Sequence, residues 1–228
     1  VHWTKPENNL VLQHAAPVTH NFSVFYDTKP GVPADERWKG VGGTNKDGLV
    51  RFVSADGIEW RKLMGDEPML PPHEGYRYDS QNLVFWSEAE GKYLCYYRSF
   101  VKIDDVRVRW ISRASSPDFI HWTEEGKMSF RDASGDPTPS EHLYTNQTGA
   151  YLRAPHIYIS IAARFLPGRR VLTEEEANAV GVDPGYFNDI SEAILMTSRG
   201  GMVYDRTFMD GFVRPGLGFE NWTSRTNY

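Results

Sequence analysis

The sequence has little of three things that define common protein classes. Among its 228 residues Cys95 is the single cysteine, so no disulfide can form within the chain. No apolar run reaches the roughly 18 residues of a membrane-spanning helix, so we expect no membrane partner. Helical periodicity is confined to 172–180, where Thr173 before three glutamates is typical of a helix N-terminus. Aromatic residues, by contrast, make up 14% of the chain, enough for a substantial buried core.

Positive charge is also scarce. The formal net charge is −5, whereas a surface that follows nucleic-acid phosphates needs massed lysine and arginine. We therefore expect no nucleic-acid partner. The chain begins with Val1 and shows no leader, which leaves the compartment open, with a periplasmic or secreted location slightly favoured.

A repeated motif gives the chain its organisation. The run Ser54–Trp60 (SADGIEW) recurs as Ser116–Trp122 (SPDFIHW), and a weaker third copy covers Ser198–Tyr204. Trp3 fits the end of an earlier copy, so the closing aromatics are spaced by 57, 62 and 82 residues. Asn21, Asn82 and Asn146 each open an apolar run, and Asn227 fits the start of a fourth. Their spacings of 61, 64 and 81 residues include the same long last interval. Two markers that share one period indicate repeated structural units.

Each unit is predicted to hold four short strands. In the second unit these are 82–87, 92–98, 107–113 and a strand after Trp122, with a hairpin signal at 88–91. Four-stranded units of this length predict an all-β fold, a β-propeller with about three blades in this chain. We expect blades at about 21–65, 82–130 and 146–210, a blade remnant at 1–20, and the start of a further blade at 211–228. On this interpretation the rest of the ring consists of further blades of the same polypeptide, which are the partners of these three.

Two stretches resemble glycoside hydrolases of families 32 and 43, the invertase, levanase and arabinanase group. They are Tyr78–Trp86 (YDSQNLVFW), followed by Glu90-Gly91-Lys92-Tyr93, and the turn at Ser116–Trp122. The families place Asp-Pro, then Val-Phe-Trp and an acidic-Gly-Lys hairpin, at these points. The resemblance implies a five-bladed propeller, of which this chain is an internal fragment, and a carbohydrate as partner. The chain departs from the pattern in two places: Ser80 replaces the proline, and Thr19-His20 stands where the first-blade aspartate is expected.

Glycoside hydrolysis needs two carboxylates beside the scissile bond. By the resemblance, Asp79 matches the aspartate that supports the acid, and Glu141 matches the general acid one blade later. Both precede an asparagine that opens a predicted inner strand, so we predict both as catalytic residues at one end of neighbouring blades. The alternative is that both acids cap turns.

Substrate-binding roles are predicted for five residues next to inner strands or turns: His20, Asn21, Asn82, Asn146 and Arg153. The repeated asparagines fit a structural role equally well, because a ligand does not share the symmetry of a ring. Arg153 pairs with an acid by default. The histidine spacing does not match a zinc site, so we predict no metal and no cofactor.

Three functions fit these observations. A glycoside hydrolase is the leading hypothesis. A non-catalytic carbohydrate-binding propeller is the second, motivated by the unmatched first-blade aspartate. A protein-interaction propeller is the third, since function is not fixed by fold.

Overall fold

The structure is a computed structural model, and it describes residues 2, 4–5, 9–12, 15, 17–75, 77–182, 185–216 and 218–221. Trp3, predicted as the end of an earlier copy of the motif, and Asn227, predicted as the start of a further blade, lie outside these residues. The chain divides into two compact units, one formed by 1–97 and 113–125 and the other by 98–112 and 126–228.

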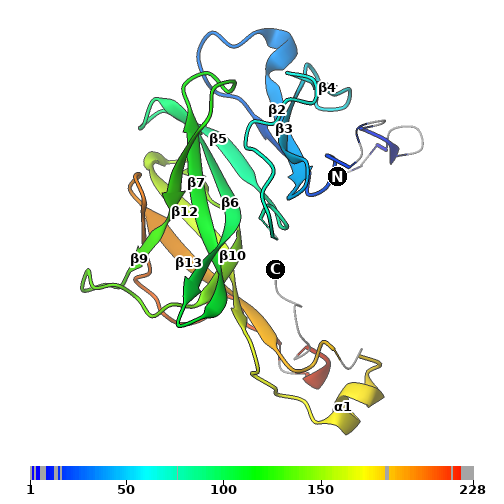
Figure 1. The fold of residues 1–228 in the computed structure, drawn as a ribbon, viewed down its shortest axis with the longest axis vertical. Coiled ribbons are helices and arrows are strands. Elements are labelled where there is room, and N and C mark those ends of the chain that lie inside the picture. Colours follow the sequence, from blue (N-terminus) through cyan, green and yellow to red (C-terminus); the bar gives the residue numbers. More distant parts are fainter. Residues whose placement is uncertain are drawn as a thin grey trace. The chain divides into compact units, whose positions relative to one another are not determined.

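The described chain is almost entirely β-structure, arranged in three sheets (Figure 1). The first sheet has the order β1 (Ser23–Tyr26), β2 (Trp38–Thr44), β3 (Gly48–Ser54), β4 (Arg61–Lys62). The second has the order β5 (Leu83–Ser87), β6 (Lys92–Ile103), β7 (Val106–Ser116), β8 (Thr123–Lys127). Both follow the chain order that the sequence predicts for a blade.

The third sheet departs from that order. Its strands run β10 (His142–Asn146), β12 (Ala154–Leu166), β13 (Ile190–Ser198), β14 (Val203–Asp205), β9 (Ser129–Arg131), and β11 (Gly149–Tyr151) also pairs with β12. The first strand is interrupted after Asn146, so this asparagine ends a strand instead of opening one. β9 begins within the limits expected for the second blade (82–130), but it pairs in parallel with β14. The third sheet therefore has six strands and is not purely antiparallel.

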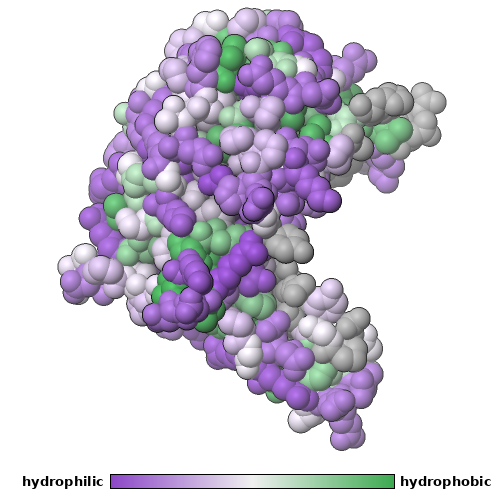
Figure 2. Space-filling view, viewed as in Figure 1, coloured by the Kyte–Doolittle hydropathy of each residue, from purple (hydrophilic) through white to green (hydrophobic). Residues whose placement is uncertain are grey.

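Helices are few and short. α1 (Glu174–Ala179) lies in the connection between β12 and β13 (Figure 1), and two 3₁₀ turns cover Ala34–Glu36 and Phe219–Asn221. The predicted N-cap is confirmed, because Thr173 and Glu176 form a reciprocal capping box. On the face shown in Figure 2, mostly hydrophilic side chains cover this connection. Within the described ranges, no helix combines the length and the apolar character needed to cross a bilayer.

The repeated motif forms the same turn twice. In the first copy Asp56 Oδ1 accepts hydrogen bonds from the backbone N–H groups of Ile58 (2.8 Å) and Glu59 (2.9 Å). In the second, Asp118 Oδ1 accepts the same two bonds, from Ile120 and His121, at 2.8 Å each. Each closing tryptophan donates its indole N–H to the backbone carbonyl three residues before it. The motif therefore closes the hairpin between the third and fourth strands.

The residue after each aspartate has a left-handed backbone. Gly57 has φ 79° and Phe119 has φ 70°. Glycine adopts this conformation without strain, whereas Phe119 is held there with its ring fully buried against Phe25 and Tyr93. In the third copy, which has no aspartate, the Ser198 hydroxyl instead donates to the carbonyl of Val203 (2.7 Å).

The core of the first unit is aromatic. Tyr78, Tyr93, Tyr97 and Phe119 are fully buried together with Cys95. Burial raises the pKa of the Cys95 thiol, so this side chain is an unreactive core residue. The sequence favours the same interpretation, since Cys95 lies in a run of buried aromatics.

A buried charge joins the first two sheets. Asp27, at the end of β1, is fully buried and accepts a hydrogen bond from the Tyr93 hydroxyl of β6 at 2.6 Å. The ammonium of Lys39, 3% exposed, lies 2.9 Å from the same carboxylate oxygen. Lys39 also donates to the carbonyl of Glu36 (2.8 Å). Every charge in this cluster has a partner, as a buried ion requires.

Removing this carboxylate should destabilise the first unit. We expect Asp27→Asn to lower the free energy of unfolding by about 3–5 kcal/mol, because Lys39 is then buried without a counter-ion. The measurement is equilibrium denaturation in urea. Adding Lys39→Met should recover part of the loss, while Asp66→Asn, which breaks an exposed pair with Lys62, should change stability by less than about 1 kcal/mol. A double variant less stable than Asp27→Asn would contradict this account.

A second ion-pair network predicts a pH effect on stability. Burial raises the pKa of Glu125, but hydrogen bonds from Arg113, Lys92 and Ser115 outweigh it and lower the pKa from 4.5 to about 2. Because the folded pKa lies below the unfolded one, this stabilisation is complete above pH 4.5 and is lost as the pH falls towards 2. We expect Glu125→Gln to flatten the dependence of the unfolding free energy on pH in that window. The exposed Glu175→Gln is the control and should leave the slope unchanged.

Candidate active site

A tight turn places His20 at the start of β1. The N–H of His20 donates to the carbonyl of Pro17 (3.1 Å), and Phe22 donates to Thr19 (3.3 Å). Asn21 between them has φ 51°, a left-handed conformation that asparagine tolerates better than most residues. Gly43 in β2 donates to the His20 carbonyl (3.0 Å), which fixes the turn against the first sheet. The left-handed conformation that the turn requires therefore explains why an asparagine occupies position 21.

A second strained loop places Asp79 before β5. Tyr78 is fully buried with φ 66°, and its hydroxyl donates to the carbonyl of Pro71 (3.0 Å). The Asn82 side chain donates to the carbonyls of Tyr78 (3.1 Å) and Ser80 (3.0 Å), on either side of Asp79. Asn82 is itself fully buried. It therefore holds the backbone that carries the acid, and its side chain is not available to a substrate.

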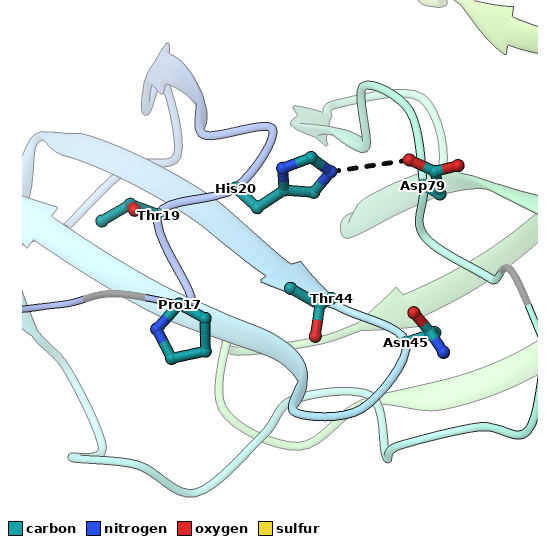
Figure 3. A pocket seen from close by; sticks show the side chains of 6 residues that line it. All are labelled: Pro17, Thr19, His20, Thr44, Asn45 and Asp79. Carbon is teal, nitrogen blue, oxygen red and sulfur yellow. Dashed lines mark ion pairs between the residues drawn. The ribbon is translucent and has the colours of Figure 1, made fainter.

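His20 and Asp79 meet at the edge of a cavity (Figure 3). The imidazole points towards the carboxylate, with 3.5 Å between His20 Nε2 and Asp79 Oδ1. The two side chains are 50% and 49% exposed. The cavity has a volume of about 500 Å³ and is lined also by Pro17, Thr19, Thr44 and Asn45. A half-exposed carboxylate, an imidazole, hydroxyls and an amide can all form hydrogen bonds with the hydroxyl groups of a sugar.

Glu141 lies directly before β10 in the second unit, in a different environment. Its two carboxylate oxygens contact two guanidinium groups: Arg164 Nη1 at 3.1 Å and Arg206 Nη1 at 2.7 Å. Arg164 also pairs with Glu192 and donates to the carbonyl of Met209 (2.9 Å). The surroundings of Glu141 are thus cationic, whereas a carboxyl group that acts as a proton donor needs surroundings that disfavour its charged form.

Two further sequence-predicted residues lie away from these acids. Asn146 is fully buried and accepts a hydrogen bond from the Thr148 hydroxyl at 2.8 Å. Arg153 is exposed in the turn between β11 and β12. This turn lies at the start of the 13-residue strand β12, whereas His142, next to Glu141, pairs with Phe165 near its end. Arg153 and Glu141 are therefore at opposite ends of one strand.

Sequence reasoning missed several residues around the two acids. Thr44 and Asn45 reach the cavity from the hairpin after β2, and Arg164, Glu192 and Arg206 surround Glu141. They lie far apart in the sequence and belong to no short motif. Only strand pairing, such as that of Arg164 with Glu192, brings them together. No cluster of three or more histidine, cysteine, aspartate or glutamate side chains that could hold a metal occurs among the described residues.

Comparisons with known proteins give the fold family. No family model and no curated protein matches the sequence. A candidate glycoside hydrolase from Bacteroides ovatus ATCC 8483 is similar in structure, with a TM-score of 0.53 and 15% identity over 88% of this chain and 54% of that one. A glycosyl hydrolase from Bacteroides ovatus has a TM-score of 0.50 and 12% identity over 86% of this chain and 51% of the other.

These similarities confirm the predicted fold class. The chain has the fold of the β-propeller glycoside hydrolases, at a sequence identity of only 12–15%. It spans about half the length of these solved proteins, 54% and 51%. The number of blades in a whole ring stays a prediction, as do the blade limits.

The Asn82 side chain offers a direct test of how Asp79 is held. We expect Asn82→Ala to lower the free energy of unfolding by about 2 kcal/mol, because two hydrogen bonds from a buried amide are lost. Gln81→Ala, at the adjacent position, should have the smaller effect. Equal stability of Asn82→Ala and the unmodified protein, measured by urea denaturation, would contradict the role assigned to Asn82.

Proposed function

We propose that this chain forms part of the propeller of a glycoside hydrolase, with Asp79 and Glu141 as its catalytic carboxylates. The observation that carries the proposal is the half-exposed Asp79 in a cavity of about 500 Å³, in a chain with the fold of these enzymes. Hydrolysis of a glycosidic bond uses one carboxyl group to protonate the leaving oxygen and another to attack or to activate water.

The pairing of the two acids is supported by their positions in the sequence. Each precedes the first strand of its own sheet, and the family resemblance matches both to functional acids. His20 and the polar groups at Thr19, Thr44 and Asn45 would bind substrate hydroxyls in the cavity. Asn82 and Asn146 are left out of the proposed binding residues because they are fully buried, and Arg153 because it lies at the far end of β12.

A carbohydrate-binding protein without catalysis is the second candidate. His20 favours this candidate. It lines the cavity at the position where the resemblance to families 32 and 43 implies the first-blade aspartate. Such a protein would bind a glycan in the same cavity and release it unchanged.

The decisive experiment is hydrolysis of chromogenic and natural glycosides by the full-length protein. We expect Asp79→Asn and Glu141→Gln each to reduce turnover by at least about 10²-fold, because each removes a group that acts on the reacting bond. Asp66→Asn, an exposed carboxylate in the same unit as Asp79, is the matched control and should keep full activity.

Three outcomes separate the candidates. Loss of turnover in both acid variants, with each variant still folded at the assay temperature, supports the hydrolase. Glycan binding measured by calorimetry without any turnover supports the binding protein, provided that Asp79→Asn weakens it. Unchanged turnover after either substitution removes that residue from the proposed mechanism.

A further inference from the structure

Glu141 is the counter-charge of a buried arginine. The Arg206 side chain is fully buried, and Glu141 Oε2 lies 2.7 Å from its Nη1. Among the residues that the structure describes, Nε, Nη1 and Nη2 of Arg206 have no partner with hydrogen-bond geometry. The negative charge of Glu141 is therefore the main compensation for the Arg206 cation. A guanidinium does not lose its proton in proteins, so neutralising Glu141 would leave a buried charge unpaired.

A second arginine holds the other oxygen of the same carboxylate. Arg164 Nη1 contacts Glu141 Oε1 at 3.1 Å and is fixed in turn by Glu192, which is 5% exposed. Arg214 lies 3.5 Å from the second oxygen of Glu192. Two acids thus alternate with three arginines, so Glu141 cannot turn away without breaking the ion pairs of its neighbours.

We propose that Glu141 acts as a charged carboxylate on the attacking side of the bond, with Arg206 as its positioning residue. This assignment rests on the proposed function and changes the role of proton donor that the resemblance implies for Glu141. As a base, Glu141 takes a proton from water while the water oxygen bonds to the anomeric carbon. As a nucleophile, its own oxygen forms that bond, and water later hydrolyses the ester. In both cases the glycosidic C–O bond breaks, and the departing oxygen keeps the electron pair and is protonated by another acid.

Leaving-group chemistry distinguishes the two roles. Dinitrophenolate departs without protonation, so loss of a proton donor hardly affects a dinitrophenyl glycoside but slows an alkyl glycoside of the same sugar. We expect Glu141→Gln to reduce kcat by about 10³-fold or more on both substrates. Near-normal turnover of the dinitrophenyl glycoside by Glu141→Gln would identify Glu141 as the donor and overturn the proposal.

The positioning role of Arg206 has its own test. We expect Arg206→Met to lower kcat by about 10-fold to 100-fold with little change in KM, and Arg206→Lys to restore part of it, because lysine keeps the charge. In a Glu141→Gln background, Arg206→Met should cause no further loss. The control is Arg131→Met, which removes an arginine paired with Asp205 in the same sheet and should leave kcat unchanged. An equal loss in both backgrounds would show that Arg206 does not act through Glu141.

A stability measurement separates failure of this inference from failure of the proposed function. The double-mutant cycle of Glu141→Gln and Arg206→Met in urea denaturation should give a coupling of about 10-fold in the unfolding equilibrium, because each substitution removes one charge of the pair. This measurement needs no known substrate. No coupling would overturn the pairing. If the two residues are not coupled but the protein hydrolyses glycosides, only the role of Arg206 is wrong and the proposed hydrolase function stands. If they are coupled but the protein hydrolyses no glycoside, both the hydrolase function and the catalytic role of Glu141 are wrong.

Discussion

The carboxylate of Asp27 is the interaction on which the first unit depends. It lies where β1 ends, and it is bound by Lys39 of the same sheet and by Tyr93 of the second sheet. Because all three groups are removed from water, none can lose its partner without a large cost. The cluster therefore fixes β1 against β6, and the turn that carries His20 at the other end of β1 inherits that fixed position. A buried ion pair that does not line the cavity of His20 and Asp79 thus helps to position the candidate site.

The two candidate acids contrast sharply in their surroundings. Asp79 is half exposed, contacts the imidazole of His20, and faces an open cavity. Glu141 is held by two arginines, one of them fully buried. An exposed carboxylate can contact a substrate, while a carboxylate beside a buried cation balances the charge of that cation. These different environments are the physical basis for giving the two acids different roles within one proposed hydrolase.

The interpretation of the repeats depended on particular residues. Ser54–Trp60 and Ser116–Trp122 predicted a turn, and in both the aspartate binds the two N–H groups that the pattern implies. Thr173 before three glutamates predicted the start of α1. These features are local: side chain and backbone partners lie within three residues of each other. The third sheet was less predictable, because β9 leaves its neighbours in the sequence to pair with β14, more than 70 residues away.

The sequence by itself determined the all-β fold and the repeated hairpin turns, and it marked Asp79 and Glu141 as candidate catalytic residues. Each of these features is encoded by neighbouring residues. Only the tertiary structure decided what surrounds the two acids. It placed His20 beside Asp79, buried Asn82 and Asn146, and brought Arg164 and Arg206 to Glu141. Strand pairing selects such neighbours, and the charge on a carboxylate depends on them more than on the residues adjacent in the chain.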